Sequence, residues 1–280
     1  MIIWISSYPK SGNTWVRALL SSYFYSKDGN FHFDLLEHIK EFPKHSDYLN
    51  EISVYKNLAE IAKEWIPAQR KLNLKHNNST FFLKTHSTIC NVEGSHFTNK
   101  ENSLGAIYVV RDPRNVILSL SNHFDLSIEK SLEMICNKKQ IITNPTKENR
   151  YIGFTVLSDW QNHYRTWKNC KLVEVKIVKY EDLILSPKNT FISILNYINK
   201  FMQVDIDEDR IKNVLMSTKF SKLQQSENKY GFKESSNMSG FNKKFFNLGP
   251  KNNWKNLLKK EIKEKIENHF KEEMKELGYL

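Results

Sequence analysis

The sequence predicts an α/β protein built as three layers, αβα, with a central parallel sheet between two layers of helices. Short apolar runs typical of buried strands alternate along the 280 residues with segments whose apolar residues recur at helical spacing. The first of these runs passes through a glycine-containing turn into a helix, the kind of connection that a parallel sheet uses. Ligands bind such sheets at the carboxyl ends of the strands, so we expect the functional residues there.

The expected elements follow in chain order. Strands are predicted at residues 2–6, 80–84, 106–110 and 173–178. Helices are predicted at residues 14–23, 51–68, 113–124, 128–136, 151–168, 187–199 and 259–276. Residues 27–50, 138–150 and 227–253 are expected to be loops, the first of them a candidate lid. Because no repeat or linker divides the chain, we expect residues 1–280 to form a single domain.

The composition is that of a globular protein that binds anions. A hydrophobic content of 40% is enough for one core and argues against disorder, and the net charge of +11 favours anionic partners such as nucleotides. The three cysteines are far apart and form no CxxC pair, so neither a zinc site nor a disulfide framework is predicted. A reducing compartment fits this pattern. With no signal-peptide pattern and no apolar run near the ~20 residues of a membrane span, a cytoplasmic protein is expected.

Residues 8–15, with the sequence Tyr-Pro-Lys-Ser-Gly-Asn-Thr-Trp, are the most informative motif. They connect a strand to a helix, whose free N-terminal amides and dipole favour an anion. The residues that could contact a phosphate or a base are Lys10, Ser11, Gly12, Asn13, Thr14 and Trp15. Because the lysine precedes the only glycine, this is not the P-loop of ATP-binding proteins. On its chemistry alone, the turn fits either a phosphate site or an ordinary capped helix start.

Two further candidates lie at the ends of other predicted strands. Arg111 ends the third strand, and Ser119 lies two turns along the next helix. An arginine there can hold a phosphate through two parallel N–H donors, although Arg-Asp-Pro-Arg is also typical of a salt-bridged helix start. Lys84 and His86 belong to a Lys-Thr-His element after the second strand. Histidine can take a proton near neutral pH, although a lone histidine at a strand end is more often a surface or capping residue.

Taken together, these motifs resemble sulfotransferases that use 3′-phosphoadenosine 5′-phosphosulfate (PAPS), and this chain is similar to a bacterial-like member of the cytosolic type. Residues 8–15 are similar to the family's 5′-phosphosulfate loop, and Arg111 with Ser119 to its 3′-phosphate motif. The Lys-Thr-His element resembles the one that carries the family's catalytic base. The resemblance covers nearly the whole chain and implies the P-loop-NTPase-like sulfotransferase fold.

The resemblance also implies a role for each matching residue. The residues assigned to the nucleotide are Lys10, Ser11, Gly12, Asn13, Thr14, Trp15, Arg111, Ser119, Tyr180, Thr218, Phe220 and Gly249. The catalytic residues are His86 as the base, Lys10 on the bridging and sulfonate oxygens, and Lys84 as a supporting charge. The implied reaction is an in-line transfer of the sulfonate group to an acceptor hydroxyl, which releases adenosine 3′,5′-bisphosphate (PAP) and needs no metal.

The match weakens near residue 250. The family pattern Arg-Lys-Gly-x-x-Gly-Asp-Trp is replaced here by residues 247–254, which keep Gly249 and Trp254 but lack the Arg and Lys. Lys243, Lys244 or Lys251 are candidates to replace the missing cations. The family's dimerisation motif is also missing, so a monomer or a weak dimer is expected.

The acceptor cannot be identified from the sequence, because its pocket should be formed by loops near residues 27–50, 87–99, 138–150 and 227–244. A small alcohol, a sugar, a lipid or a peptide all remain open. Two other classes of function also remain open: a kinase or other phosphoryl transferase using ATP and Mg²⁺, and a basic nucleic-acid-binding protein. The missing P-loop pattern argues against the first, and the lack of a recognition module argues against the second.

Overall fold

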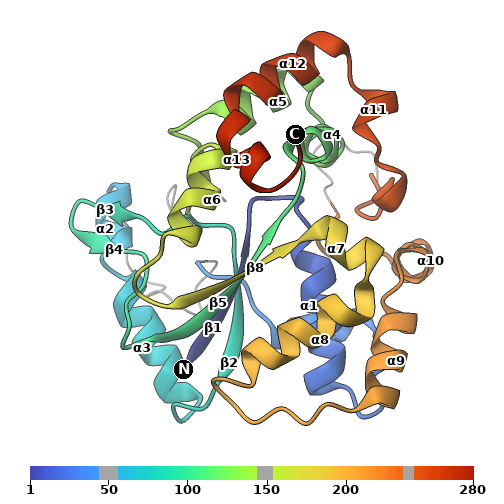
Figure 1. The fold of residues 1–280 in the computed structure, drawn as a ribbon. Helices are drawn as coiled ribbons and strands as arrows, with labels where there is room; N and C mark the ends of the chain where they lie inside the picture. Colours follow the sequence, from blue (N-terminus) through green and yellow to red (C-terminus); the bar gives the residue numbers. More distant parts are fainter. Residues whose placement is uncertain (44–55, 144–153, 236–242) are drawn as a thin grey trace.

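The computed structural model describes residues 1–43, 56–143, 154–235 and 243–280. Its centre is a four-stranded sheet in which every pair of neighbouring strands is parallel, with the order β2-β1-β5-β8 (Figure 1). The bounds of these strands are Ile2–Ser7 for β1, Phe81–Thr85 for β2, Ser103–Val110 for β5 and Glu174–Lys179 for β8. The predicted parallel α/β sheet is therefore confirmed, and each predicted strand corresponds to one of the four.

The register of the sheet brings the candidate site together. Ser6 pairs with Thr85, and Ser7 pairs with Val109, so β1, β2 and β5 end at the same edge. The turn after β1, the histidine after β2 and the arginine after β5 therefore emerge side by side. Four residues that carry these ends, Ser6, Ser7, Thr85 and Val109, are fully buried, which makes the edge a rigid base for the site.

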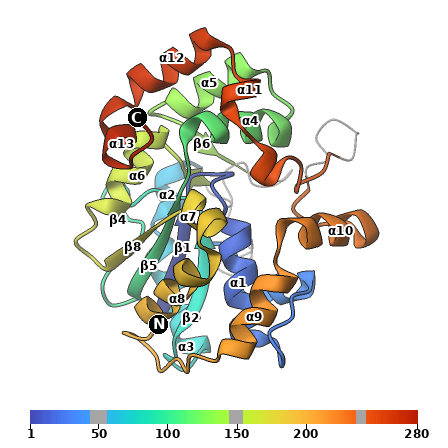
Figure 2. The same cartoon turned by 45° about the vertical axis from the view of Figure 1, so that its right-hand side comes forward.

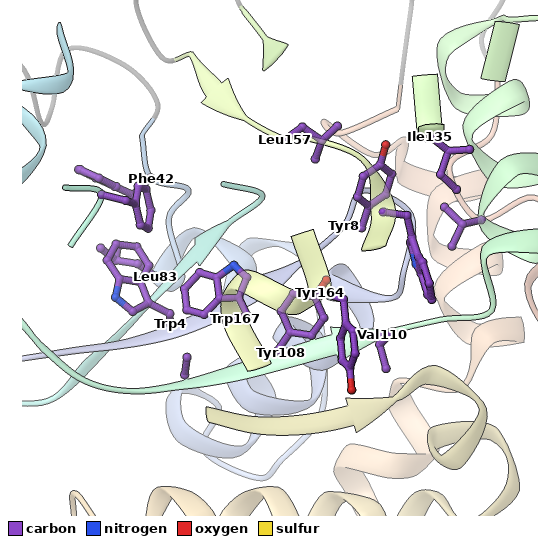
Figure 3. Close-up of a cluster of buried hydrophobic side chains, with 14 of the residues drawn as sticks. Trp4, Tyr8, Phe42, Leu83, Tyr108, Val110, Ile135, Leu157, Tyr164 and Trp167 are labelled. Carbon is purple, nitrogen blue, oxygen red and sulfur yellow. The ribbon is translucent and has the colours of Figure 1, made fainter. Parts of the chain in front are cut away.

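Helices cover both faces of the sheet, as the three-layer prediction requires. Successive residues of β1 point to opposite faces, so Ile3 and Ile5 join one core cluster while Ile2 and Trp4 join the other. The first cluster packs under α1 (Asn13–Tyr25), α8 (Pro187–Ile198) and α9 (Glu208–Ser217), which lie near one another in Figures 1 and 2. The second cluster is rich in aromatic rings, among them Trp4, Tyr108 and Trp167 (Figure 3).

The remaining elements complete both layers. The helices are α2 (Leu58–Ala62), α3 (Trp65–Lys75), α4 (Pro113–Phe124), α5 (Ile128–Cys136), α6 (Trp160–Lys168), α7 (Tyr180–Leu185), α10 (Phe220–Tyr230), α11 (Trp254–Leu257), α12 (Lys260–His269) and α13 (Lys271–Glu276). The short strands and 3-10 turns are β3 (Asn91–Val92), β4 (Ser95–His96), β6 (Ile141–Ile142), β7 (Thr155–Val156), η1 (Phe33–His38) and η2 (Gly249–Lys251). No helix within the described ranges has the length and apolar character needed to cross a bilayer.

The structure corrects several predicted elements. The helix predicted at residues 151–168 begins only at Trp160, because the Asp159 carboxylate caps it by accepting from the Asn162 amide at 2.8 Å. Upstream of this cap, residues 154–159 are not helical, and β7 pairs with β6. The helix predicted at residues 259–276 is divided at Phe270 into α12 and α13. The first part of the helix predicted at residues 51–68 lies outside the described residues.

Candidate functional site

A cavity of about 1000 Å³ opens at the carboxyl ends of β1, β2 and β5. Twelve of the fourteen predicted site residues line it, namely Lys10, Gly12, Asn13, Thr14, Trp15, Lys84, His86, Arg111, Ser119, Tyr180, Phe220 and Gly249. The other two, Ser11 and Thr218, are buried beside it rather than in its wall. The Thr218 hydroxyl donates to the carbonyl of Val214 at 2.7 Å. The cavity is therefore assembled from turns after three strands and from segments that are distant in sequence, from Pro9 to Asn252.

The turn after β1 has the shape that an anion site requires. Lys10 and Gly12 both have positive φ, at 67° and 108°. A side chain at Gly12 would lie 2.6 Å from the ring of Tyr180, so only glycine fits there. Gly12 provides no side-chain cap for α1, and the first amides of a helix have no partner within the helix. The N-terminus of α1 therefore offers backbone donors to the cavity.

Lys10 carries a charge that depends strongly on its surroundings. Burial lowers the pKa of Lys10 to about 7; Glu234 opposes this shift, and the charges of Lys84 and Arg111 add to it. Its Nζ lies 3.5 Å from the ring centroid of Phe245. With a pKa of about 7, Lys10 is partly protonated at neutral pH, and a nearby anion would favour its charged form.

His86 is held in one tautomer. Its Nδ1 lies 2.7 Å from the carbonyl oxygen of Ser7, and since a carbonyl only accepts, Nδ1 bears the proton. Nε2 is then the basic nitrogen. Burial, with a smaller contribution from the Lys84 charge, lowers the pKa of His86 to about 4, so the ring is neutral at pH 7. His163 supports this arrangement, because its Nε2 donates to the His86 carbonyl at 2.9 Å and its Nδ1 accepts from the Tyr108 hydroxyl.

Arg111 and Ser119 meet as their spacing predicted. A terminal nitrogen of Arg111 donates to Ser119 Oγ at 3.4 Å and to the carbonyl of Lys10 at 3.2 Å. The guanidinium stacks on the ring of Tyr180 at 4.1 Å. This contact joins the end of β5 to the first residue of α7, so Tyr180 packs against both Gly12 and Arg111. The two predicted anion-binding turns are therefore parts of one wall.

In the altered motif near residue 250, no candidate lysine is recorded in contact with Ser119 within the described residues. Lys251 is exposed, Lys243 pairs with the carboxylate of Asp125, and the backbone carbonyl of Lys244 accepts from the amide of Asn122. Instead, the side-chain amide of Asn252 donates to Ser119 Oγ at 2.9 Å. Sequence reasoning missed Asn252 because an asparagine in a loop carries no pattern of its own.

Two more charged residues of the cavity were missed, Arg17 and Glu234. The Glu234 carboxylate accepts from Arg17 at 2.6 Å and from the Thr14 hydroxyl at 3.2 Å, and it lies 3.9 Å from Lys84 Nζ. Burial opposes its ionisation, but Lys84 and Arg17 outweigh burial and lower the pKa of Glu234. Helical spacing could have indicated Arg17, three residues after Thr14 on the same face of α1. No local signal indicated Glu234.

In a comparison with sequence models of protein families, the model of the sulfotransferase domain matches residues 2–278 of the chain. The chain belongs to the sulfotransferase family. This confirms the resemblance stated from the motifs, and with it the prediction that the chain is a sulfotransferase. Sulfotransferase 1B1 of Canis lupus familiaris is 25% identical to this sulfotransferase over 275 residues, which cover 96% of the chain and 82% of the relative. The amine sulfotransferase of Oryctolagus cuniculus is 24% identical over 279 residues, covering 98% and 81%.

Solved structures of similar fold agree with the architecture. Mouse sulfotransferase SULT7A1, in complex with PAP, has a TM-score of 0.56 and 17% identity, with 98% of this chain and 84% of that chain covered. Retinol dehydratase, in a complex with retinol and PAP, has a TM-score of 0.58 and 15% identity, with 98% and 81% covered. At this level of identity the likeness concerns the fold, and it confirms the αβα sulfotransferase fold.

Proposed function

We propose that this sulfotransferase moves the sulfonate group of PAPS to an acceptor hydroxyl, with His86 as the general base. The observation that carries the proposal is the state of His86: the carbonyl of Ser7 holds the proton on Nδ1, and Nε2 is left as a base in a cavity shared with Lys10 and Lys84. A neutral imidazole with a defined basic nitrogen is what removal of a proton from a hydroxyl requires. The family to which the chain belongs supports the class of reaction.

The donor would lie along the wall formed by the two turns. The amides at the start of α1 and the Lys10 charge suit the 5′-phosphosulfate, and Arg111 with Ser119 suits the 3′-phosphate. Aromatic rings of Trp15, Tyr180 and Phe220 line the same cavity and suit the adenine. Gly249 packs so closely on Phe220 that a side chain there would lie 2.4 Å from the ring, which supports its predicted place beside the base. The PAP complexes of SULT7A1 and retinol dehydratase are consistent with this donor.

PAPS supplies an activated sulfonate group with PAP as the leaving group. In the proposed step, a bond forms between the acceptor oxygen and sulfur, the bond from sulfur to the bridging oxygen breaks, and the proton of the acceptor passes to His86 Nε2. Negative charge grows on the bridging oxygen, where Lys10 neutralises it with help from Lys84. A well-placed donor at such an oxygen contributes about 3–4 kcal/mol, and a general base about 10²–10⁴-fold. Metal-free catalysis stays a prediction.

The proposal is tested first by binding and then by turnover. We expect PAP to raise the melting temperature of the protein, whereas ATP with Mg²⁺ has a smaller effect; a shift with ATP and Mg²⁺ but none with PAP would favour the kinase alternative. Turnover is then measured with ³⁵S-labelled PAPS against a panel of alcohols, sugars, lipids and peptides. No transfer to any acceptor in such a panel, together with no binding of PAP, would refute the proposed reaction.

The variant His86→Asn keeps a donor toward the Ser7 carbonyl but removes the basic nitrogen. We expect turnover to fall about 10²–10⁴-fold, while the affinity for PAP stays within about twofold. Full activity of His86→Asn would remove His86 from the mechanism.

The pH profile of the wild-type enzyme reports on the same residue. Its acid limb should lie well below pH 6.5, because the lowered pKa of about 4 keeps the His86 ring unprotonated, and so able to accept a proton, at mildly acidic pH.

A further inference from the structure

Asn252 is buried where the segment after η2 meets α4, with 6% of the residue exposed. Its side-chain amide donates to the carbonyl of Asn115 and to the hydroxyl oxygen of Ser119, both at 2.9 Å. The segment around it is fixed on both sides. The backbone amide of Asn252 donates to the carbonyl of Gly249 at 3.1 Å, and the backbone amide of Trp254 donates to Asn115 Oδ1 at 3.0 Å. Asn252 is therefore held firmly against Ser119.

The contacts of Ser119 determine what its hydroxyl can do. A hydroxyl has two lone pairs that accept and one proton that it donates. Ser119 Oγ accepts from Asn252 at 2.9 Å and from Arg111 at 3.4 Å, which uses both lone pairs. Its proton is therefore available to a third group. Ser119 and Asn252 both line the cavity, so that third group can be part of a bound ligand.

Two buried polar atoms of the same cluster have no hydrogen-bond partner. They are Nε of Arg111, a donor, and Oδ1 of Asn252, an acceptor. A buried polar atom left unpaired costs about 1–3 kcal/mol, so such atoms gather where a ligand completes the site. With the Ser119 proton, the cluster has two unpaired donors, that proton and Arg111 Nε, against one unpaired acceptor, Asn252 Oδ1. A ligand group made of acceptor oxygens, such as a phosphate, fits this arrangement better than a hydroxyl.

We propose that Asn252 is a positioning residue that makes Ser119 a donor and thereby sets the preference of the site for a 3′-phosphate over a 3′-hydroxyl. This inference rests on the proposed function, because it assumes that the ribose of the donor lies beside Arg111 and Ser119. Asn252 acts through Ser119 and needs no contact with the transferred group. The chemical class selected is a nucleotide that carries phosphate at both the 3′ and the 5′ position.

The experiment compares two probes, PAP and adenosine 5′-monophosphate, by isothermal titration calorimetry. The ratio of their dissociation constants reports only on the 3′-phosphate, so a general loss of structure does not change it. For Asn252→Ala we expect the preference for PAP to fall about tenfold, the effect of losing one hydrogen bond to a charged group, while binding of the monophosphate changes by less than about twofold. Asn252→Asp, which also adds a negative charge, should lower the preference further.

The chain offers a matched control next door. Asn253 is exposed and caps α11 through its side-chain oxygen, a role that aspartate also fills, so Asn253→Asp makes the same chemical change without touching Ser119. Its preference for PAP should stay within about threefold of wild type, because the added carboxylate is exposed and its effect on the phosphate is largely screened by salt. In a Ser119→Ala background, Asn252→Ala should have little further effect, because the hydroxyl through which it acts is gone.

The outcomes separate the inference from the proposed function. A wild-type protein that prefers PAP, and variants of Asn252 that keep this preference or weaken both probes equally, would overturn the inference and leave the proposed function intact. A wild-type protein that binds neither probe would overturn both. The expected result is that the Asn252 variants lose the preference for PAP, whereas Asn253→Asp keeps it. In the Ser119→Ala background, the Asn252→Ala substitution should cause no further loss of preference.

Discussion

At the scale of single residues, the charge of Lys10 depends on what shares its cavity. Burial lowers its pKa to about 7 in the free protein, so near pH 8 most Lys10 side chains are neutral. A bound phosphate or sulfonate oxygen favours the charged form and raises this pKa again. Near pH 8, Lys10 therefore becomes fully charged when an anion binds, which suits a residue that is proposed to neutralise a leaving group.

This coupling predicts proton uptake on binding of PAP. At pH 8, above the pKa of free Lys10, we expect close to one proton to be taken up, and progressively less as the pH falls below 7, where Lys10 is already protonated. The measurement is titration calorimetry of PAP in buffers of different ionisation enthalpy. Lys10→Met should abolish this uptake. An uptake unchanged in Lys10→Met would assign the proton to another group.

Glu234 leads to a second prediction at this scale. Its carboxylate holds Thr14 and Arg17 and lies near Lys84, two of which are residues predicted to face the donor. An anion already present competes with another anion, so Glu234→Gln should bind PAP about 3–10-fold more tightly, about 1 kcal/mol. Without a ligand, the same variant should melt at a lower temperature, because Arg17 and Lys84 each lose one partner. The loss should be partial, since Arg17 still donates to the carbonyl of Ile39 and Lys84 still pairs with Glu41.

The control for Glu234 is an exposed ion pair made by the neighbouring residue, Lys233. Glu37 pairs with Lys233 at 3.0 Å, but both side chains are largely exposed. Because exposed ion pairs contribute little, Glu37→Gln should change neither the affinity for PAP nor the melting temperature appreciably. An unchanged or weaker affinity in Glu234→Gln would show that the carboxylate does not compete with the donor.

At the scale of elements, the segment after α13 is joined to the turn after β5. The Tyr279 hydroxyl donates to Glu181 at 2.8 Å, and the same carboxylate accepts from the amide of Asp112 at 3.1 Å, next to Arg111. The carbonyl of Tyr279 accepts from Arg114 at 2.7 Å. The C-terminal segment after α13, in the upper part of Figure 1, therefore helps to hold the wall of the cavity.

Tyr279→Phe tests this connection. It removes a hydrogen bond to a half-buried carboxylate, so we expect a loss of about 1–3 kcal/mol in the free energy of unfolding, measured by urea denaturation. Tyr164→Phe removes a bond of the same length, 2.8 Å, to the exposed Glu276, and it should cost less, about 0.5 kcal/mol. Equal losses in the two variants would show that the burial of Glu181 adds nothing.

The elements themselves were predictable to different degrees. Strands β1, β2 and β5 were predicted because each contains an apolar run, and β8 because its apolar residues are β-branched and alternate with charged ones. Helices α4 and α5 were predicted with their bounds, since Asp112 and Ser127 cap them and their apolar residues recur regularly. Helices α7, α9 and α10 were missed. Helix α7 has only six residues, and α9 and α10 each bury only two, which leaves a weak apolar period.

At the scale of the whole molecule, the two core clusters lie on opposite faces of the same strands, β1, β2 and β5. Ile2 and Trp4 belong to one cluster and Ile3 and Ile5 to the other, so neither face of the sheet can lose its packing without exposing the back of β1. This supports the prediction of a single domain. We expect one calorimetric transition, with a van't Hoff enthalpy equal to the calorimetric one.

Binding of PAP should shift this single unfolding transition as a whole. PAP at 100 times its dissociation constant should raise the free energy of unfolding by about 2.7 kcal/mol and move the whole transition to higher temperature. Two separate transitions, of which PAP moves only one, would contradict the single-domain prediction. The scan without ligand is the reference for both.

The sequence by itself determined the sheet, the two turns and the histidine, because these depend on local patterns: an apolar period, a glycine that only a tight turn requires, and strand ends that must meet at one edge. The tertiary structure alone decided which side chains complete the cavity and which support its wall. Glu234 meets Thr14 across 220 residues of sequence, Asn252 meets Ser119 across 133, and Tyr279 meets Glu181 across 98. Two members of these pairs, Glu234 and Asn252, lie in loops, where neither period nor capping indicates a partner, so only the packing of the whole chain brings them together.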